Sequence, residues 1–222
     1  FNHKEFTGRS GTFFGYEGLG SIYWHMVSKL QLAVLETCQG AIENNASAEI
    51  TGGLVAHYYR INEGIGVHKS PELYGAFPTD PYSHTPFNKG AQQPGMTGQV
   101  KEDILSRFGE LGVSVTEGKL IFKPVLLRKK EFLSQFKTTN FIDIFSNHHD
   151  LLLEKDSLCF TYCQVPVIYK MAQVEGLEII FNDGKKETFG VLHLDEKNSE
   201  KIFERRGEVF QIKVFINEKV LW

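Results

Sequence analysis

The chain has 222 residues, of which 41% are hydrophobic, 13% aromatic and 23% charged, and its formal net charge is −3. This composition is typical of a globular protein and excludes global disorder. The sequence has no basic field and no apolar run of about 20 residues, so nucleic-acid binding and a membrane span are both disfavoured. We expect a cytoplasmic protein, with a periplasmic location as the alternative.

Two further features of the sequence are its first residue and its three cysteines. The chain opens on Phe1 without an initiator methionine and soon enters a glycine-rich motif, so we expect a fragment or processed part of a longer protein. The cysteines Cys38, Cys159 and Cys163 have no partners at zinc-type spacing. They are interpreted as reduced, buried thiols, and no metal site is expected.

Residues 1–112 are predicted to be loop-rich and helical. A helix is expected over Ser21–Cys38, with Ser21 as its N-cap, because the segment lacks Gly and Pro and is apolar over much of its surface. A second helix is expected from about Ser47 to Asn62. Gly64–Gly95 holds most of the prolines and many aromatic residues, which is typical of a long functional loop.

A third helix is predicted over Thr97–Phe108. Val100, Ile104 and Phe108 recur at a spacing of four residues, and we expect this side of the helix to face inward.

Residues 113–222 are predicted to be almost wholly β. Val113–Thr116 and Lys119–Phe122 flank a Glu-Gly turn and should form a hairpin. Many short strands at this spacing favour a sandwich. The further expected strands are Phe141–Phe145, Leu158–Tyr162, Val165–Met171, Glu178–Phe181, Thr188–Leu194 and Val209–Ile216.

Three motifs could carry chemistry. The first is glycine-rich at residues 8–12 and continues through Glu17 to His25, at the start of the first predicted helix. Glycines admit close approach of a ligand, and a helix N-terminus offers unpaired N–H groups. The alternative is a glycine-rich loop beside a buried, hydrogen-bonded histidine.

The second motif is a proline-stiffened loop that presents Asp80, Tyr82 and His84, and the alternative is an ordinary surface loop. The third motif runs through Gln93 to the Thr97-Gly98 pair at the start of a helix. Backbone N–H groups, a hydroxyl and the positive end of the helix dipole would suit a phosphate. The alternative is plain N-capping by Thr97.

Taken in order, these motifs resemble the C-terminal stretch of the cellobiose and chitobiose phosphorylase family. That family has a Glu-x-Gly-Gly-x-Tyr-x-His segment opening a helix, then a Pro/Tyr/Asp loop, then a Thr-Gly pair opening another helix. The counterparts are Glu17–His25, Asp80–Tyr82 and Gly90–Gly98, followed by Leu111-Gly112 and Gly118–Leu120. The match covers roughly residues 8–127 by motif order, and the rest only by β character.

The resemblance implies an α+β fold. Residues 1–112 would hold the C-terminal helical hairpins of an α/α toroid, which is the catalytic domain, and residues 113–222 an antiparallel β-sandwich-like domain. His25, Thr97 and Gly98 match family positions that hold inorganic phosphate. Contacts to sugar, or ordering of the loop, are expected from five further residues, namely Glu17, Asp80, Tyr82, His84 and Gln93.

The implied reaction is inverting phosphorolysis of a disaccharide or oligosaccharide. Phosphate attacks the anomeric carbon while a carboxylic acid protonates the leaving oxygen. That acid lies upstream in the family, so it is not expected in this chain, which alone would be inactive. Inorganic phosphate is the co-substrate and no other cofactor is expected. The partners expected are the missing N-terminal part or a second copy of the chain.

This sequence departs from the family after Thr97-Gly98, where Lys101 and Glu102 replace small and aromatic residues. One alternative is therefore an inverting hydrolase with Glu102 as the general base. The plainest interpretation of Glu102 is an exposed carboxylate in a first helical turn. A further alternative is a non-catalytic carbohydrate-binding or interaction module in which the β-rich tail is the working part.

Overall fold

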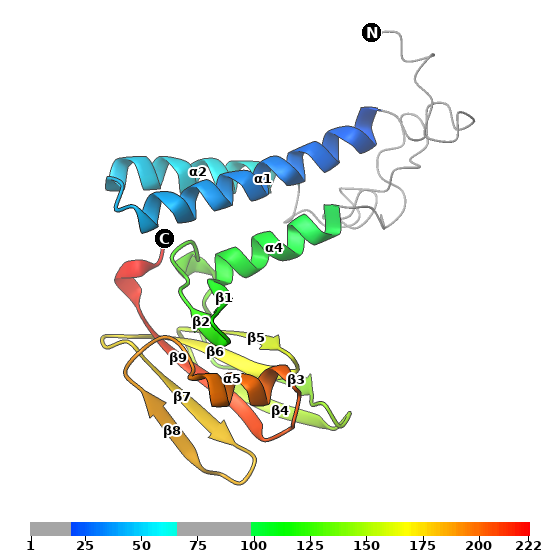
Figure 1. Ribbon diagram of the computed structural model, residues 1–222, viewed down its shortest axis with the longest axis vertical. Helices are drawn as coiled ribbons and strands as arrows, with labels where there is room; N and C mark the ends of the chain where they lie inside the picture. Colours follow the sequence, from blue (N-terminus) through cyan, green and yellow to red (C-terminus); the bar gives the residue numbers. More distant parts are fainter. Residues whose placement is uncertain (1–18, 66–98) are drawn as a thin grey trace, which may run out of the picture. The chain divides into compact units, whose positions relative to one another are not determined.

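The computed structural model describes residues 19–65 and 99–222 (Figure 1). The chain divides into two compact units, Phe1–Arg107 and Phe108–Trp222. The described part of the first unit is helical and the second contains the strands, so the fold belongs to the α+β class, as predicted.

The first unit contains a hairpin of two helices, α1 (Leu19–Glu43) and α2 (Ala48–Ile65), which lie side by side (Figure 1). The chain leaves α1 through a Schellman motif, in which Ala46 N donates to Ala41 O at 2.9 Å and Asn45 N to Ile42 O at 3.1 Å. Asn45 takes the left-handed conformation that this motif requires, with φ of 54°. The hydroxyl of Ser47 then accepts from Ile50 N at 3.3 Å and caps α2.

The first helix is longer at both ends than the sequence predicted. Ser21 was expected to be its N-cap but lies inside α1, because the helix already begins at Leu19. Its expected end at Cys38, two residues before Gly40, was also wrong, because α1 continues to Glu43. The asparagine-based Schellman motif ends the helix, and it is a less obvious sequence signal than the glycine.

Packing of the helical hairpin follows one stripe on α1. Its buried residues recur three to four positions apart and change along the helix from polar Ser28 and Gln31 to apolar Leu35 and Cys38. On α2, Val55, Tyr58 and Tyr59 are buried. On α1 the buried stripe is therefore polar toward the start of the helix and apolar toward the loop that leads to α2.

The helix α4 (Gln99–Leu111) has an unexpected orientation. Its buried residues Glu102, Ser106 and Glu110 form a polar stripe, whereas Ile104 is 52% exposed. The prediction that Ile104 faces inward was therefore wrong. Glu102 is bonded to Lys29 of α1, which turns the polar stripe inward and leaves Ile104 outside.

The second unit is built on a five-stranded sheet of order β5-β6-β9-β7-β8. Neighbouring strands are antiparallel except for β6 and β9, which are parallel. Strand β9 lies at the centre of this order, and it buries Val209, Gln211, Ile212, Val214 and Ile216. The strands are β5 (Ser157–Tyr162), β6 (Val165–Ala172), β7 (Gly176–Phe181), β8 (Lys186–Phe189) and β9 (Val209–Asn217).

One face of this sheet carries the larger core. The hairpin of β1 (Val113–Thr116) and β2 (Lys119–Phe122) packs there together with helix α5 (Glu196–Phe203). A buried bond from Leu120 N to Ser199 Oγ, 2.9 Å long, joins β2 to α5. The short 3₁₀ turns are Lys129–Glu131 and Glu218–Val220.

The opposite face carries a smaller core. It is covered by the hairpin of β3 (Lys137–Ile142) and β4 (His148–Leu153). Phe141, Leu151 and Leu153 of the hairpin pack against Ile168 of the sheet. The second unit is thus one mixed sheet with a hairpin on each face, rather than the antiparallel sandwich that the sequence suggested.

Four details of the β unit differ from the sequence prediction. Of the strand expected over Phe141–Phe145, only Phe141 and Ile142 lie in a strand, at the end of β3. The segment expected as a strand over Thr188–Leu194 divides at Gly190: β8 ends at Phe189, and the later part pairs with β2 through Phe122 N to Leu192 O and Leu194 N to Leu120 O. Strand β4 and helix α5 were not predicted. The hairpin over Val113–Thr116 and Lys119–Phe122 was predicted with the observed bounds.

Candidate functional site

Most of the residues proposed for the sugar and phosphate site lie outside the described part of the chain. His25 belongs to the second turn of α1, but only its backbone position is described. Glu102 is the one candidate whose side chain is described. The candidates outside the described residues are Glu17, Asp80, Tyr82, His84, Gln93, Thr97 and Gly98.

Glu102 is buried and paired. The residue is 2% exposed, and its Oε1 accepts a hydrogen bond of 2.9 Å from Lys29 Nζ. The Lys29 side chain is 54% exposed, so the pair joins a solvent-exposed lysine to a buried carboxylate. The interpretation of Glu102 as an exposed first-turn carboxylate was therefore wrong. The contact with α1 removes it from solvent.

Two serine hydroxyls close in sequence to this ion pair are buried. Ser28 is 1% exposed and Ser106 is 3% exposed, and neither hydroxyl has a hydrogen-bond partner within the described part of the chain. Ser28 precedes Lys29, and Ser106 lies one turn beyond Glu102. Buried hydroxyls are usually hydrogen-bonded, either to protein groups or to ordered water.

The Lys29–Glu102 bond also joins the two helices that carry the predicted phosphate motifs. In Figure 1, α1 and the first turns of α4 run in the same direction, so both helices begin at the same end of the first unit. His25 is one turn before Lys29 in α1, and Thr97-Gly98 directly precede Gln99, the first residue of α4. The ion pair brings the first turn of α4 against α1 one turn beyond His25, and the N-terminus of α4 favours binding of an anion.

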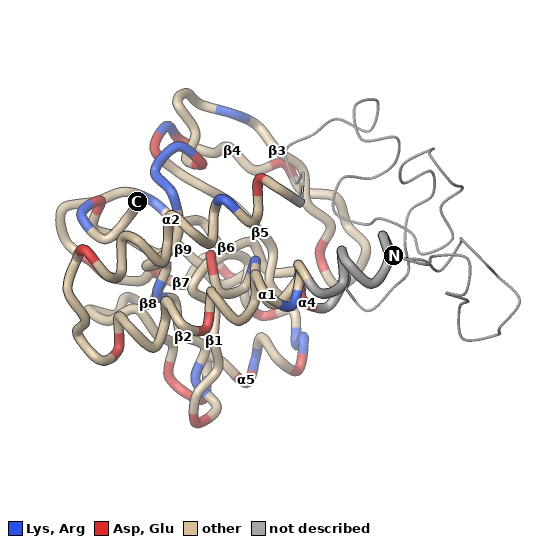
Figure 2. Tube along the Cα trace, turned by 90° about the horizontal axis from the view of Figure 1, so that it is seen from above, with Lys and Arg blue, Asp and Glu red and all other residues tan. Residues whose placement is uncertain are grey.

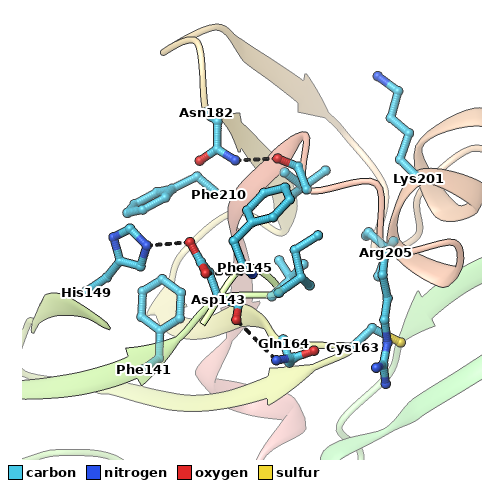
Figure 3. Close-up of a pocket in the computed structure, with 15 residues that line it drawn as sticks. Phe141, Asp143, Phe145, His149, Cys163, Gln164, Asn182, Lys201, Arg205 and Phe210 are labelled. Atoms are coloured by element: carbon cyan, nitrogen blue, oxygen red, sulfur yellow. Dashed lines mark hydrogen bonds and ion pairs between the residues drawn. The ribbon is translucent and has the colours of Figure 1, made fainter. Parts of the chain in front are cut away.

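A second candidate lies in the β unit, in a pocket drawn in Figure 3 between the β3–β4 loop and the segment before β9. Asp143 accepts a 2.8 Å bond from His149 through Oδ2, and its Oδ1 accepts from the backbone N–H groups of Phe145 and Asn147, each at 2.8 Å. The His149 ring stacks on Phe141, with centroids 5.1 Å apart. The cavity is about 30 Å³, too small for a sugar.

The electrostatics of this pocket indicate a structural role. The bond with His149, assisted by the bonds from Asn147 and Phe145, lowers the pKa of Asp143 well below its usual range, so the group is ionised at neutral pH. Gln164 Nε2 donates to the backbone carbonyl of Asp143 at 3.2 Å. Asp143 therefore fixes the loop between β3 and β4 and links it to the turn after β5.

Two of the three cysteines are unsuited to act as nucleophiles. Cys38, Cys159 and Cys163 are all free thiols. Burial raises the pKa of Cys38 and of Cys159 to about 11, so both are protonated and unreactive at neutral pH.

Within residues 19–65 and 99–222, no group of three or more His, Cys, Asp or Glu side chains is arranged to hold a metal ion. No helix in these ranges is long and apolar enough to cross a membrane. Acidic and basic residues are interspersed along the trace in Figure 2.

Comparison with models of known protein families gave no match, and comparison with curated proteins gave no significant match. The phosphorylase resemblance therefore rests on the motifs alone. Sequence reasoning did not single out Lys29, Ser28 or Ser106. A signal for Lys29 was present, because it follows His25 by four residues and so falls on the same side of the helix.

Proposed function

We propose that the chain is the C-terminal portion of a carbohydrate-active enzyme of the inverting glycoside phosphorylase type. Inorganic phosphate would bind where α1 and α4 begin, held by His25, Thr97 and the backbone of Gly98. The observation that carries the proposal is the ion pair between Lys29 and the buried Glu102, which joins the two helices one turn beyond these residues.

The proposed reaction is a single displacement. A phosphate oxygen forms a bond to the anomeric carbon as the glycosidic carbon–oxygen bond breaks on the opposite face. The leaving oxygen takes a proton from a carboxylic acid upstream of this chain. Imidazole, hydroxyl and backbone N–H groups suit the phosphate, and the N-terminus of α4 adds positive potential.

In this scheme Glu102 and Lys29 are positioning residues. The Glu102 carboxylate accepts the bond from Lys29, and so ties the start of α4 to α1. This contact would set the distance between the phosphate-binding groups that the two helices contribute. The toroid to which these helices would belong remains part of the proposal, since the described helices form only one hairpin and one further helix in the first unit.

Hydrolysis on the same scaffold is the second candidate, with Glu102 as general base for water. Burial of its carboxylate favours this candidate, since catalytic carboxylates are often desolvated. The contact with Lys29 supports the positioning role instead, because it occupies one of the two carboxylate oxygens.

The natural protein that carries the chain should be assayed on cellobiose and diacetylchitobiose with and without inorganic phosphate. We expect a sugar 1-phosphate of inverted configuration and an equal amount of free sugar, only when phosphate is present. Release of free sugar without phosphate would support hydrolysis. If no disaccharide reacts and an oligosaccharide binds equally well to the His25→Ala and Thr97→Val variants, the chain is a non-catalytic module.

The matched variants of Thr97 test the phosphate site itself. Thr97→Val removes the hydroxyl and should raise the KM for phosphate about tenfold, as expected for loss of one hydrogen bond to a charged group. Thr97→Ser keeps the hydroxyl and should retain most of the affinity. Equal KM values for the two variants would remove Thr97 from the site.

A further inference from the structure

The loop between β3 and β4, residues 143–147, is braced from within. Asp143 Oδ1 accepts from the backbone N–H groups of Phe145 and Asn147, each at 2.8 Å, and Asp143 Oδ2 accepts from Asn147 Nδ2 at 3.1 Å. Along the backbone, Asp143 N donates to Asn147 O at 3.0 Å, and Ser146 N donates to Asp143 O at 3.1 Å. These five hydrogen bonds make the loop a small rigid body.

The surface on which this loop rests is also fixed. It is the segment just before β9, where Gly207 has a left-handed φ of 70°. Gly207 O accepts from Asn182 Nδ2 at 2.5 Å, a bond drawn in Figure 3, and Glu208 O accepts from Asn182 N at 2.9 Å. The turn after β7 therefore holds this segment in place, independently of the β3–β4 loop.

The contact between the loop and this segment is weaker than the bonds within either. Ile144 and Phe145 rest on Gly207, because a Cβ added there would lie 2.6 Å from the Phe145 ring and 2.9 Å from Ile144 Cδ1. Phe145 nevertheless stays 64% exposed. In the described part of the chain, one hydrogen bond reaches the loop from outside the hairpin, from Gln164 Nε2 to Asp143 O at 3.2 Å (Figure 3).

The cavity of about 30 Å³ lies between the loop and this segment, so the two are not close-packed there. Its volume suits about two water molecules. Separation of the loop would therefore lose one neutral hydrogen bond and a partly exposed apolar contact. A neutral hydrogen bond changes an equilibrium only about fivefold, so a separated state should be populated at about 0.1–10%.

We propose that residues 143–147 form a lid, which swings away from Gly207 as a rigid body and opens the cavity to solvent. The hinge is the last pair of the β3–β4 hairpin, Ile142 and His148. Opening breaks the bond from Gln164 and lifts the apolar side chains of the lid from Gly207, while the five bonds within the lid persist. This inference is independent of the proposed phosphorolysis.

NMR relaxation dispersion of the full chain measures such a motion, which falls in the microsecond to millisecond range. We expect the amides of Ile144, Phe145 and Gly207 to share one exchange rate, because the lid and its seat separate in one step. Hydrogen exchange is the second readout. The Phe145 and Asn147 amides should exchange slowly, because both keep their bonds to Asp143 Oδ1 when the lid is open.

Variants of Gln164 test the bond that holds the lid closed. Gln164→Met has a similar length but no donor, and should raise the open population about fivefold. Gln164→Lys keeps a donor for Asp143 O and should stay near the wild-type population. Both replacements are unbranched at Cβ, so the left-handed φ of 64° makes the same demand on each. If they fail to fold, Phe145→Ala should raise the open population from the side of the lid.

Two results would overturn the proposal. Flat dispersion profiles at Ile144, Phe145 and Gly207, in the wild type and in Gln164→Met or Phe145→Ala, would show that the loop does not leave its seat. Fast hydrogen exchange of the Phe145 and Asn147 amides would show that the loop unfolds in place and does not move as one body.

Discussion

At the scale of single residues, the Lys29–Glu102 pair has one partner in solvent and the other buried. The carboxylate has lost its hydration, whereas the ammonium keeps part of its own. Removal of Lys29 therefore costs more than loss of a surface ion pair, which contributes at most about 1 kcal/mol. The substitution would leave the buried Glu102 carboxylate without the Lys29 ammonium.

Lys29→Met should destabilise the first unit by about 1–3 kcal/mol, because the buried Glu102 carboxylate loses a charged donor. Hydrogen exchange of the amides in α1 and α4 measures this change locally, and their exchange should accelerate. Lys29→Arg retains the charge and serves as the control. Unchanged exchange in the methionine variant would show that the pair does not hold the two helices together.

Asp143 should make the β unit sensitive to acid. Its pKa is lowered in the folded state by the bond to His149, so the stabilisation is complete at neutral pH and is lost as the pH falls below about 4. Asp143→Asn should lower the melting temperature at pH 7 and flatten its dependence on pH, so that the two curves approach each other in acid. Melting curves that stay parallel down to about pH 2 would contradict this assignment.

Residue roles were the least predictable part of the site. Glycine-rich and Thr-Gly motifs identified helix starts, but the burial of Glu102 depends on Lys29, which is distant in sequence. No local pattern reports such a contact. The Asp143–His149 bond was missed for the same reason, since it depends on the register of β3 and β4.

At the scale of elements, the junction between α4 and β1 depends on Gly112. This residue has a φ of +66°, and an added Cβ would lie 2.1 Å from the carbonyl carbon and oxygen of Lys123. Both the backbone conformation and the close approach require glycine. The junction also receives a buried hydrogen bond, from Tyr169 Oη to Leu111 O at 2.5 Å.

Gly112→Ala should therefore destabilise the β unit by more than about 2 kcal/mol. Gly190→Ala is the control, because an added Cβ there meets no atom within 4 Å, and its effect should stay within about 0.5 kcal/mol. Urea unfolding can be followed by fluorescence in a Trp24→Phe background, in which Trp222 is the sole tryptophan. Similar midpoints for both alanine variants would contradict this account of the junction.

Most elements could be predicted because their signals are local. The β1–β2 hairpin has a Glu-Gly turn with φ of 49° and 73°, which the dipeptide indicates directly. Strand β4 begins with His148, His149 and Asp150, which are weak strand formers. It forms because it pairs with β3. Helix α5 had one sequence signal, its N-cap Asp195, whose Oδ1 accepts from Asn198 N at 2.8 Å. The segment is hydrophilic, so this signal alone did not indicate a helix.

The orientation of α4 was also beyond local prediction. Its sequence places Ile104 and Phe108 on one side, which would normally face a core. Phe108 does pack against the larger core of the second unit, but Ile104 is exposed and the helix buries Glu102 and Ser106 in the first unit. Hydrophobic spacing predicts that a helix exists, but a buried polar contact can decide which side faces inward.

At the scale of the whole molecule, the β unit has a core of its own. The buried residues of the larger cluster all fall between Leu111 and Leu221. A piece covering residues 99–222, which keeps α4 whole, should therefore fold alone and unfold cooperatively. Near-ultraviolet circular dichroism and thermal unfolding test this expectation, and a broad transition without fixed aromatic signals would contradict it.

The central claim, a phosphate site where α1 and α4 begin, is tested most directly by a crystal structure of the chain soaked in inorganic phosphate. The account predicts density for phosphate beside His25 and Thr97, and its loss in crystals of Thr97→Val but not of Thr97→Ser. Phosphate bound elsewhere, with this position empty at high concentration, would contradict the claim.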